Sequence, residues 1–214
     1  MISIEYLAVV VLILTAGVVY FTYTHARSKR QIDNMAERLS ILPEHFVVVD
    51  LETTGLDPLR HEIIEIGAIR VNRDSVRHQT FHCFIKPTQK VPKKITKLTG
   101  ITQAIVDEKG DPIEAGLRQF ADFAGDLRIV TFNAEFDMAF LRHAGAQFGL
   151  TFANPVSCAL KMARRAWPGR RSYRLADLSA DGGLDTTDSH HAIGDCRRAL
   201  IVYTGAVSRL GTLH

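Results

Sequence analysis

The longest uncharged apolar run of the chain stands near its start, at residues 6–23, and contains 18 apolar or weakly polar residues. As a helix rising about 1.5 Å per residue, the run spans about 27 Å, close to the hydrocarbon thickness of a bilayer. No basic residue precedes it, whereas Arg27, Lys29 and Arg30 follow it, which is the opposite of a cleaved signal peptide. We therefore expect residues 1–24 to form a single-pass anchor in the inner (cytoplasmic) membrane, with the following domain in the cytoplasm. A buried core helix is the alternative interpretation.

Residues 25–43 show a weaker helical pattern. Apolar side chains recur at helical spacing up to a closing proline, at Ile32, Met35, Ala36, Leu39 and Pro43. The pattern predicts an amphipathic connector. The connector either packs on the following domain or lies at the membrane surface, and the sequence does not choose between the two.

From residue 44 onward, strand-like and helix-like patterns mix. Strands are predicted at 45–52, 61–71, 77–87 and 127–132, where β-branched and aromatic residues are dense. Helices are predicted at 111–126, at 133–145 with Asn133 as N-cap and Gly145 just past the end, at 157–166 and at 191–210. This mixture predicts one α/β domain over residues 44–210, with helices packed on both faces of a sheet.

Composition adds limited constraints. The length of 214 residues suits one ordinary domain, and a net charge of +3 permits a polyanionic partner without demanding one. The three cysteines, Cys83, Cys158 and Cys196, have no CxxC spacing. They indicate neither a disulfide framework nor a zinc site, and they fit a reducing compartment.

Two carboxylates interrupt the apolar strand at 45–52. Asp50 and Glu52 are two residues apart, so they share one face of the strand with Val48. Their Cβ atoms lie roughly 7 Å apart on that face. Two ionised groups in this position repel each other unless a cation lies between them.

Two further acids stand beside the apolar stripes of predicted helices. Asp137 has Phe140 and Leu141 at the next turn, and Asp195 shares a face with Ala199 and Val202. Either acid could instead favour a helix N-terminus or pair with a nearby arginine, the candidates being Arg174, Arg197 and Arg198. Four acids on apolar faces favour hard divalent cations, Mg²⁺ or Mn²⁺, because zinc prefers His or Cys ligands.

A histidine precedes the last of these acids. His190 lies five residues before Asp195, at the start of the predicted helix 191–210 and not inside it. A side chain with a pKa near neutrality in this place suits a general base that activates water. The neighbouring His191 is the rival candidate.

Three motifs carry a resemblance to a known family. "DLETTGL" at 50–56, "NAEFD" at 133–137 and "HHAIGD" at 190–195 resemble the three motifs of the DEDDh 3′→5′ exonucleases. That family includes the proofreading epsilon subunit of bacterial replicative polymerases, ribonuclease T and oligoribonuclease. The resemblance covers roughly residues 45–205 and implies a ribonuclease H-like fold with a mixed five-stranded sheet.

The resemblance also implies roles for individual residues. Asp50, Glu52 and Asp195 resemble the ligands of one metal, with Asp50 bridging to a second metal near Asp137. The family text His-x-Ala-x-x-Asp fits from His190, which implies that His190 is the general base. The implied substrate contacts are Thr53, Gly55 and Leu56 in the loop that holds the 3′-terminal nucleotide, and Thr99, Ile101 and Phe136 at the base pocket. One departure is the text Thr-Phe-Asn at 131–133, where many members read Gly-His-Asn.

The sequence therefore predicts a 3′→5′ exonuclease that uses two divalent cations, Mg²⁺ or Mn²⁺, to hydrolyse phosphodiester bonds at 3′ ends of single-stranded DNA or RNA. The expected products are nucleoside 5′-monophosphates. A catalytically inactive binding module and a proofreading subunit are the alternatives. A homodimer and a polymerase partner both stay open. Residues 161–174 are rich in Lys and Arg, with Trp167 and Tyr173 interleaved. They are a contact for nucleic acid, a solvated surface, or a basic patch at the cytoplasmic membrane surface.

Overall fold

The computed structural model describes residues 40–181 and 191–213. The chain divides into two compact units, Met1–Leu39 and Ser40–His214. The expected anchor at 1–24 and most of the expected connector lie outside the described residues. Within residues 40–181 and 191–213, no helix combines the length and apolarity needed to cross a membrane.

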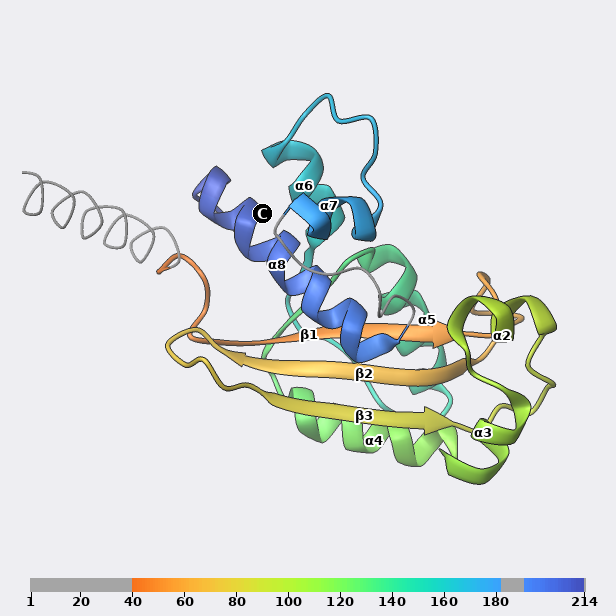
Figure 1. Cartoon of the computed structure of the whole chain (residues 1–214). Helices are drawn as coiled ribbons and strands as arrows, with labels where there is room; N and C mark the ends of the chain where they lie inside the picture. The colour runs from red at the N-terminus through yellow and green to blue at the C-terminus, as the bar shows by residue number, and fades with distance from the viewer. Residues whose placement is uncertain (1–39, 182–190, 214) are drawn as a thin grey trace, which may run out of the picture. The chain divides into compact units, whose positions relative to one another are not determined.

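A mixed sheet forms the centre of the second unit (Figure 1). Its strands are β1 (His45–Thr53), β2 (Ile63–Asn72), β3 (Gln79–Ile85), β4 (Gly110–Asp111), β5 (Arg128–Thr131) and β6 (Val156–Cys158). They lie in the order β4-β3-β2-β1-β5-β6. β2 runs antiparallel to β1 and β3, whereas β5 runs parallel to β1 and β6 parallel to β5. The expectation of five strands is wrong by one, because the two-residue β4 adds to the edge beside β3 and is too short to leave a pattern.

Helices cover both faces of the sheet, as predicted. They are α2 (Lys93–Thr99), α3 (Gln103–Lys109), α4 (Ile113–Ala124), α5 (Ala134–Ala146), α6 (Ala159–Ala166), α7 (Leu175–Asp181) and α8 (Ala192–Leu210). Figure 1 shows α4 and α8 on opposite faces of β1–β3. Several predicted bounds were wrong. Asp111, the predicted first residue of the helix 111–126, belongs to β4, and α4 begins at Ile113. α5 continues through Gly145, and residues 157–158 belong to β6 and not to the helix that follows.

The valine run of β1 is buried because both faces of the strand are covered. Val47, Val49 and Leu51 belong to a core cluster that also holds residues of α4 and α5. Phe46 faces the other way, and its ring meets that of Tyr203 on α8 edge to face, with centroids 5.7 Å apart. The even-numbered positions of β1 therefore point toward α8, and Asp50 and Glu52 follow that alternation.

Helix α8 lies directly against β2 at one glycine. A Cβ atom on Gly67 would stand 2.6 Å from Cβ of Ala192 and 2.8 Å from the backbone nitrogen of Ile193. The thiol of Cys196, one turn further along α8, lies 3.2 Å from the carbonyl oxygen of Gly67. Only a residue without a side chain lets the first turn of α8 approach β2 this closely.

The described chain begins at the opposite end of the sheet from these contacts. The Arg73 guanidinium, in the turn after β2, donates to the carbonyl oxygens of Ser40 at 3.0 Å and Leu42 at 2.7 Å. A Cβ atom on Gly211, just past α8, would lie 4.0 Å from Ile41. Residues 40–42 are therefore fixed beside the start of β1 and the end of α8.

We predict that Gly67→Ala lowers the free energy of unfolding by about 1–3 kcal/mol, because the added methyl group meets backbone atoms that cannot rotate away. Chemical denaturation followed by circular dichroism measures the change. Gly205→Ala on α8 is the control: its new Cβ atom would lie 3.4 Å from the Trp167 ring, an ordinary contact. That control should be neutral or stabilising, since Ala favours a helix over Gly. Equal stability of Gly67→Ala and the wild type would contradict the prediction.

Candidate active site

Three of the four predicted acids meet at the carboxyl end of β1. Asp50 and Glu52 come from β1, and Asp195 comes from the first turn of α8. Each offers a carboxylate oxygen, and these oxygens all lie within 4.8 Å of one another. An all-oxygen set at this spacing fits a hard divalent cation, so this acid cluster could bind a metal such as Mg²⁺ or Mn²⁺.

The fourth acid, Asp137, approaches from the other helical layer. It lies in the first turn of α5, is 3% exposed and accepts a hydrogen bond from the hydroxyl of Thr131 at the end of β5. Asn133 is the N-cap residue of α5, as predicted, although its side chain makes no capping hydrogen bond. Asp137 is outside the group of three, yet it is near enough to raise the pKa of Asp50.

Burial and mutual repulsion shift the pKa values of these acids upward. Burial raises the pKa of Asp50 well above its ordinary value, and the charges of Asp137, Asp195, Glu52 and Glu65 add to that rise. Burial, and then the charge of Glu65, raise the pKa of Glu52 to about 8. Burial raises the pKa of Asp137 to about 7 against the opposing effect of the Thr131 hydrogen bond. Such shifts are typical of functional sites, including those in which a bound cation neutralises clustered acids.

Asp195 has a cationic partner, which was one of the alternatives that the sequence left open. Nη1 of Arg198, three residues along α8, lies 2.5 Å from Oδ1 of Asp195. Arg198 is 3% exposed, so the ion pair is buried on one side. Its guanidinium holds the Asp195 carboxylate in place and offsets part of the negative charge of the cluster.

The sequence did not identify Glu65 as part of this site. It lies on β2 directly opposite Glu52 in the antiparallel ladder and is 2% exposed. A signal was present, because Glu65 interrupts an apolar strand as Asp50 and Glu52 do. Glu65 is not in the group of three, and its side chain makes other contacts.

The loop after β1 holds the predicted nucleotide contacts Thr53, Gly55 and Leu56. The Thr53 hydroxyl donates to the carbonyl oxygen of Gly55 at 2.6 Å. A Cβ atom on Gly55 would stand 2.5 Å from the His61 ring, which explains the glycine. Leu56 is 83% exposed. The loop thus presents Leu56, together with Leu59, to solvent on a tightly packed base.

The other predicted substrate residues, Thr99, Ile101 and Phe136, differ in how far they are exposed. Thr99 and Ile101 are buried, and Ile101 packs with Ile64 and Val106 under α2 and α3. Their side chains hold the α2–α3 turn, while Leu98 beside them is 53% exposed. Phe136 is half-buried and stacks on Phe140 with ring centroids 5.0 Å apart. Leu98 is therefore the exposed side chain of the predicted "LTGI" stretch, and the sequence did not single it out.

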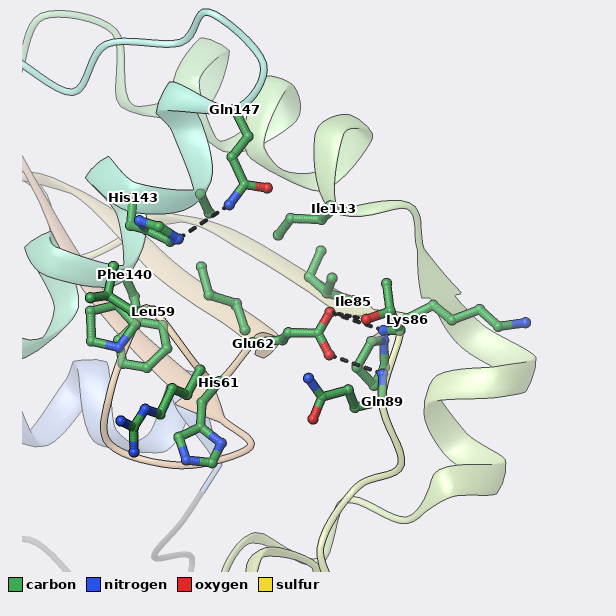
Figure 2. A pocket seen from close by; sticks show the side chains of 16 residues that line it. Leu59, His61, Glu62, Ile85, Lys86, Gln89, Ile113, Phe140, His143 and Gln147 are labelled. Carbon is green, nitrogen blue, oxygen red and sulfur yellow. Dashed lines mark hydrogen bonds between the residues drawn. The ribbon is translucent and has the colours of Figure 1, made fainter.

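A cavity of about 210 Å³ lies between residues 58–62 of the same loop and the elements β3, α4 and α5 (Figure 2). Among the residues that line it, the Glu62 carboxylate accepts hydrogen bonds from the backbone N–H groups of Thr88 and Gln89, both at 3.0 Å. None of the acids of the cluster lines this cavity. The hydrogen bonds of Glu62 tie the end of the loop to the chain that follows β3.

His190 lies outside the described residues. Much of the basic segment 161–174 makes contacts inside the domain. Lys161 pairs with Glu135 at 2.7 Å, Arg170 pairs with Asp181, and the Arg164 guanidinium lies over the Tyr173 ring. These contacts favour the interpretation of the segment as a solvated surface.

Comparison with known proteins gives a consistent result. The family model described as Exonuclease (RNase_T) matches residues 47–203. DNA polymerase III subunit epsilon of Aquifex aeolicus is 37% identical over 160 residues, which cover 74% of this chain and 78% of that protein. The PolC-type DNA polymerase III of Caldanaerobacter subterraneus is 32% identical over 169 residues, which cover 79% of this chain but only 12% of that protein.

The fold also matches solved structures. The zinc-bound Escherichia coli ExoI–ssDNA complex superposes with a TM-score of 0.69 at 19% sequence identity, covering 80% of this chain and 42% of that one. At this identity the match shows the α/β ribonuclease H-like fold alone. The family match spans most of the chain and includes all four predicted acids and Glu65. The chain therefore belongs to the exonuclease family described as RNase_T.

Proposed function

We propose that the chain is a metal-dependent 3′→5′ exonuclease that removes nucleoside 5′-monophosphates from single-stranded 3′ ends. The observation that carries the proposal is the meeting of Asp50, Glu52 and Asp195 oxygens within 4.8 Å, brought together from β1 and α8. ExoI, which shares the fold, was solved with single-stranded DNA, which supports this substrate class. Both DNA and RNA are candidates.

Asp50, Glu52, Asp195 and Asp137 would hold two divalent cations, Mg²⁺ or Mn²⁺. Such a pair stabilises the attacking and leaving oxygens of a displacement at phosphorus. Asp50 and Glu52 are on β1, which is largely buried and is paired with β2 on one side and β5 on the other. Arg198 orients Asp195. The buried Thr131 hydroxyl orients Asp137.

The remaining roles follow from position. We propose His190 as the general base that takes a proton from the attacking water, on the strength of its place just before α8. Thr53, Gly55 and Leu56 would hold the 3′-terminal nucleotide, with exposed Leu56 and half-buried Phe136 against its base. Thr99 and Ile101 would act from beneath, by holding the α2–α3 turn.

A proofreading subunit is a second candidate function. The 37% identity to DNA polymerase III subunit epsilon of Aquifex aeolicus favours it. Co-purification of the chain with a polymerase of its host would support this candidate. A homodimer remains a further possible assembly, and sedimentation velocity decides it.

We also propose that residues 1–24 anchor the chain in the cytoplasmic membrane through the apolar run 6–23, with the domain 44–210 on the cytoplasmic side and residues 25–43 as connector. The length of the run and the basic residues that follow it support this proposal.

Activity should depend on the acid cluster. With 5′-labelled single-stranded DNA or RNA and Mg²⁺ or Mn²⁺, the full-length protein should give a ladder that shortens from the 3′ end. Asp50→Asn should lower kcat at least about a hundredfold, since even outer partners of metal ligands are worth 10–100-fold. Glu114→Gln, on the exposed side of α4, is the control. A folded wild type without activity on either nucleic acid would favour a binding module instead.

Without divalent cations, the melting temperature should fall by several degrees as pH rises from about 5 to about 8. The folded state keeps protons on Glu52, with a pKa of about 8, and on Asp137, with a pKa of about 7. The unfolded chain releases both protons at about pH 4. Because the folded state binds more protons in this interval, its stability decreases as pH rises.

Divalent cations bind the deprotonated acids, so their stabilising effect should be larger at about pH 8 than at about pH 5. Differential scanning fluorimetry in chelator and in excess Mg²⁺ or Mn²⁺ measures both effects. A melting temperature in chelator that stays constant or rises across the interval would speak against the predicted protonation of the cluster.

The full-length protein should sediment with membranes after cell lysis and resist extraction by high salt and alkaline carbonate. A chain that lacks residues 1–24 should stay in the supernatant, because the apolar run supplies the affinity for the bilayer. Immunoblots of both fractions measure the distribution. Recovery of the full-length protein in the supernatant would contradict the anchor.

A further inference from the structure

Glu65 stands where a carboxylate is costly. It is 2% exposed and lies directly opposite Glu52, in a ladder position where Cβ atoms are about 5 Å apart. Like charges in such a pair destabilise a sheet, and a buried carboxylate without partners lowers the free energy of unfolding of a domain that is only marginally stable. Its presence needs an explanation in the contacts of its two oxygens.

Both carboxylate oxygens of Glu65 have specific partners. Oε1 lies 2.6 Å from Nε2 of His82, on the neighbouring strand β3. Oε2 accepts a hydrogen bond from the backbone N–H of Ala192 at 3.3 Å. Ala192 is the first residue of α8, so its N–H has no acceptor within the helix. Glu65 therefore links β3, β2 and the start of α8.

Ala192 lies in the sequence between two residues of the proposed site, His190 and Asp195. Asp195 is three residues further, in the same first turn of α8. The proposed general base His190 lies two residues before Ala192 in the sequence. Gly67, two residues along β2 on the same face, lets this turn rest directly on the strand. The backbone of Ala192 is thus held by β2 from below and by Glu65 at the helix end.

We propose that Glu65 is a positioning residue of the exonuclease site: through the Ala192 N–H it fixes the first turn of α8, and so the place of Asp195 in the acid cluster. The proposal rests on the proposed exonuclease function. Glu65 is not itself a metal ligand, since its oxygens are bound to His82 and Ala192 and it lies outside the group of three. Outer partners of this kind set the geometry of metal ligands.

Two substitutions distinguish the effect of the length of the Glu65 side chain from the effect of its charge. Glu65→Asp keeps the charge but is one methylene shorter, so it loses the contact with Ala192. Glu65→Gln loses the charge but keeps an oxygen that can accept the same N–H. Glu62→Gln is the matched control, since the Glu62 carboxylate also accepts backbone N–H groups, those of Thr88 and Gln89, without touching α8.

The first measurement needs no metal. Amide hydrogen exchange by mass spectrometry, in chelator, follows peptides that cover the first turn of α8. Glu65→Asp should exchange there at least about tenfold faster than the wild type, because the helix end opens more often. Glu65→Gln and Glu62→Gln should stay within about threefold of the wild type.

The second measurement is steady-state kinetics on a single-stranded oligonucleotide with Mg²⁺. Glu65→Asp should lower kcat about 10–100-fold with KM nearly unchanged, and Glu65→Gln should recover most of that loss. If Glu65→Asp has the same hydrogen exchange and the same kcat as the wild type, the proposal is overturned. It is also overturned if kcat falls more in Glu65→Gln than in Glu65→Asp, because the effect would then come from the charge. An inactive wild type whose Glu65→Asp variant still loosens α8 would refute the function and leave the positioning contact standing.

Discussion

Repulsion among carboxylates at the carboxyl end of β1 is the constraint on which the rest of the domain depends. Asp50 and Glu52 stand on one strand, Asp195 approaches from α8, and Asp137 and Glu65 add charge from either side. Burial raises the pKa of Glu52 to about 8 and that of Asp137 to about 7, which lessens the negative charge near neutral pH. Arg198 lies against Asp195, and His82 lies against Glu65. A divalent cation could supply the remaining neutralisation, because three of these acids offer oxygens within 4.8 Å of one another.

The fold meets this constraint by bringing rigid elements together at one point. β1 is buried on both faces, and its strand neighbours β2 and β5 fix its register. Helix α8 rests on β2 at Gly67, and its start is linked to Glu65, so the helix cannot shift along the sheet without breaking contacts at both residues. Asp137 is fixed independently through α5 and Thr131. Asp50 and Asp195 are 145 residues apart in sequence, yet this arrangement keeps their carboxylate oxygens within 4.8 Å of each other.

Sequence reasoning found the parts of this arrangement that leave a periodic or motif signal. The predicted strands at 45–52 and 61–71 and the predicted helix at 191–210 correspond to β1, β2 and α8, and the meeting of Asp50, Glu52 and Asp195 was also predicted. Short elements were missed, because β4, α2, α3 and α7 hold two to seven residues and show no clear period. Contacts between distant segments were missed for a different reason. The pairing of Glu65 with Ala192 depends on register and helix placement, and the burial of Thr99 and Ile101 depends on which helix covers them, neither of which a linear pattern specifies.

The place where the described chain joins the sheet has a consequence for access. Residues 40–42 are held by Arg73 beside the start of β1, whereas the acids stand at its other end, about 23 Å away along the strand. Gly211, just past α8, lies at the same end as Ile41. The length of β1 thus separates the acids from both of these places. Neither residues 40–42 nor the end of α8 restricts a ligand's access to the acid cluster.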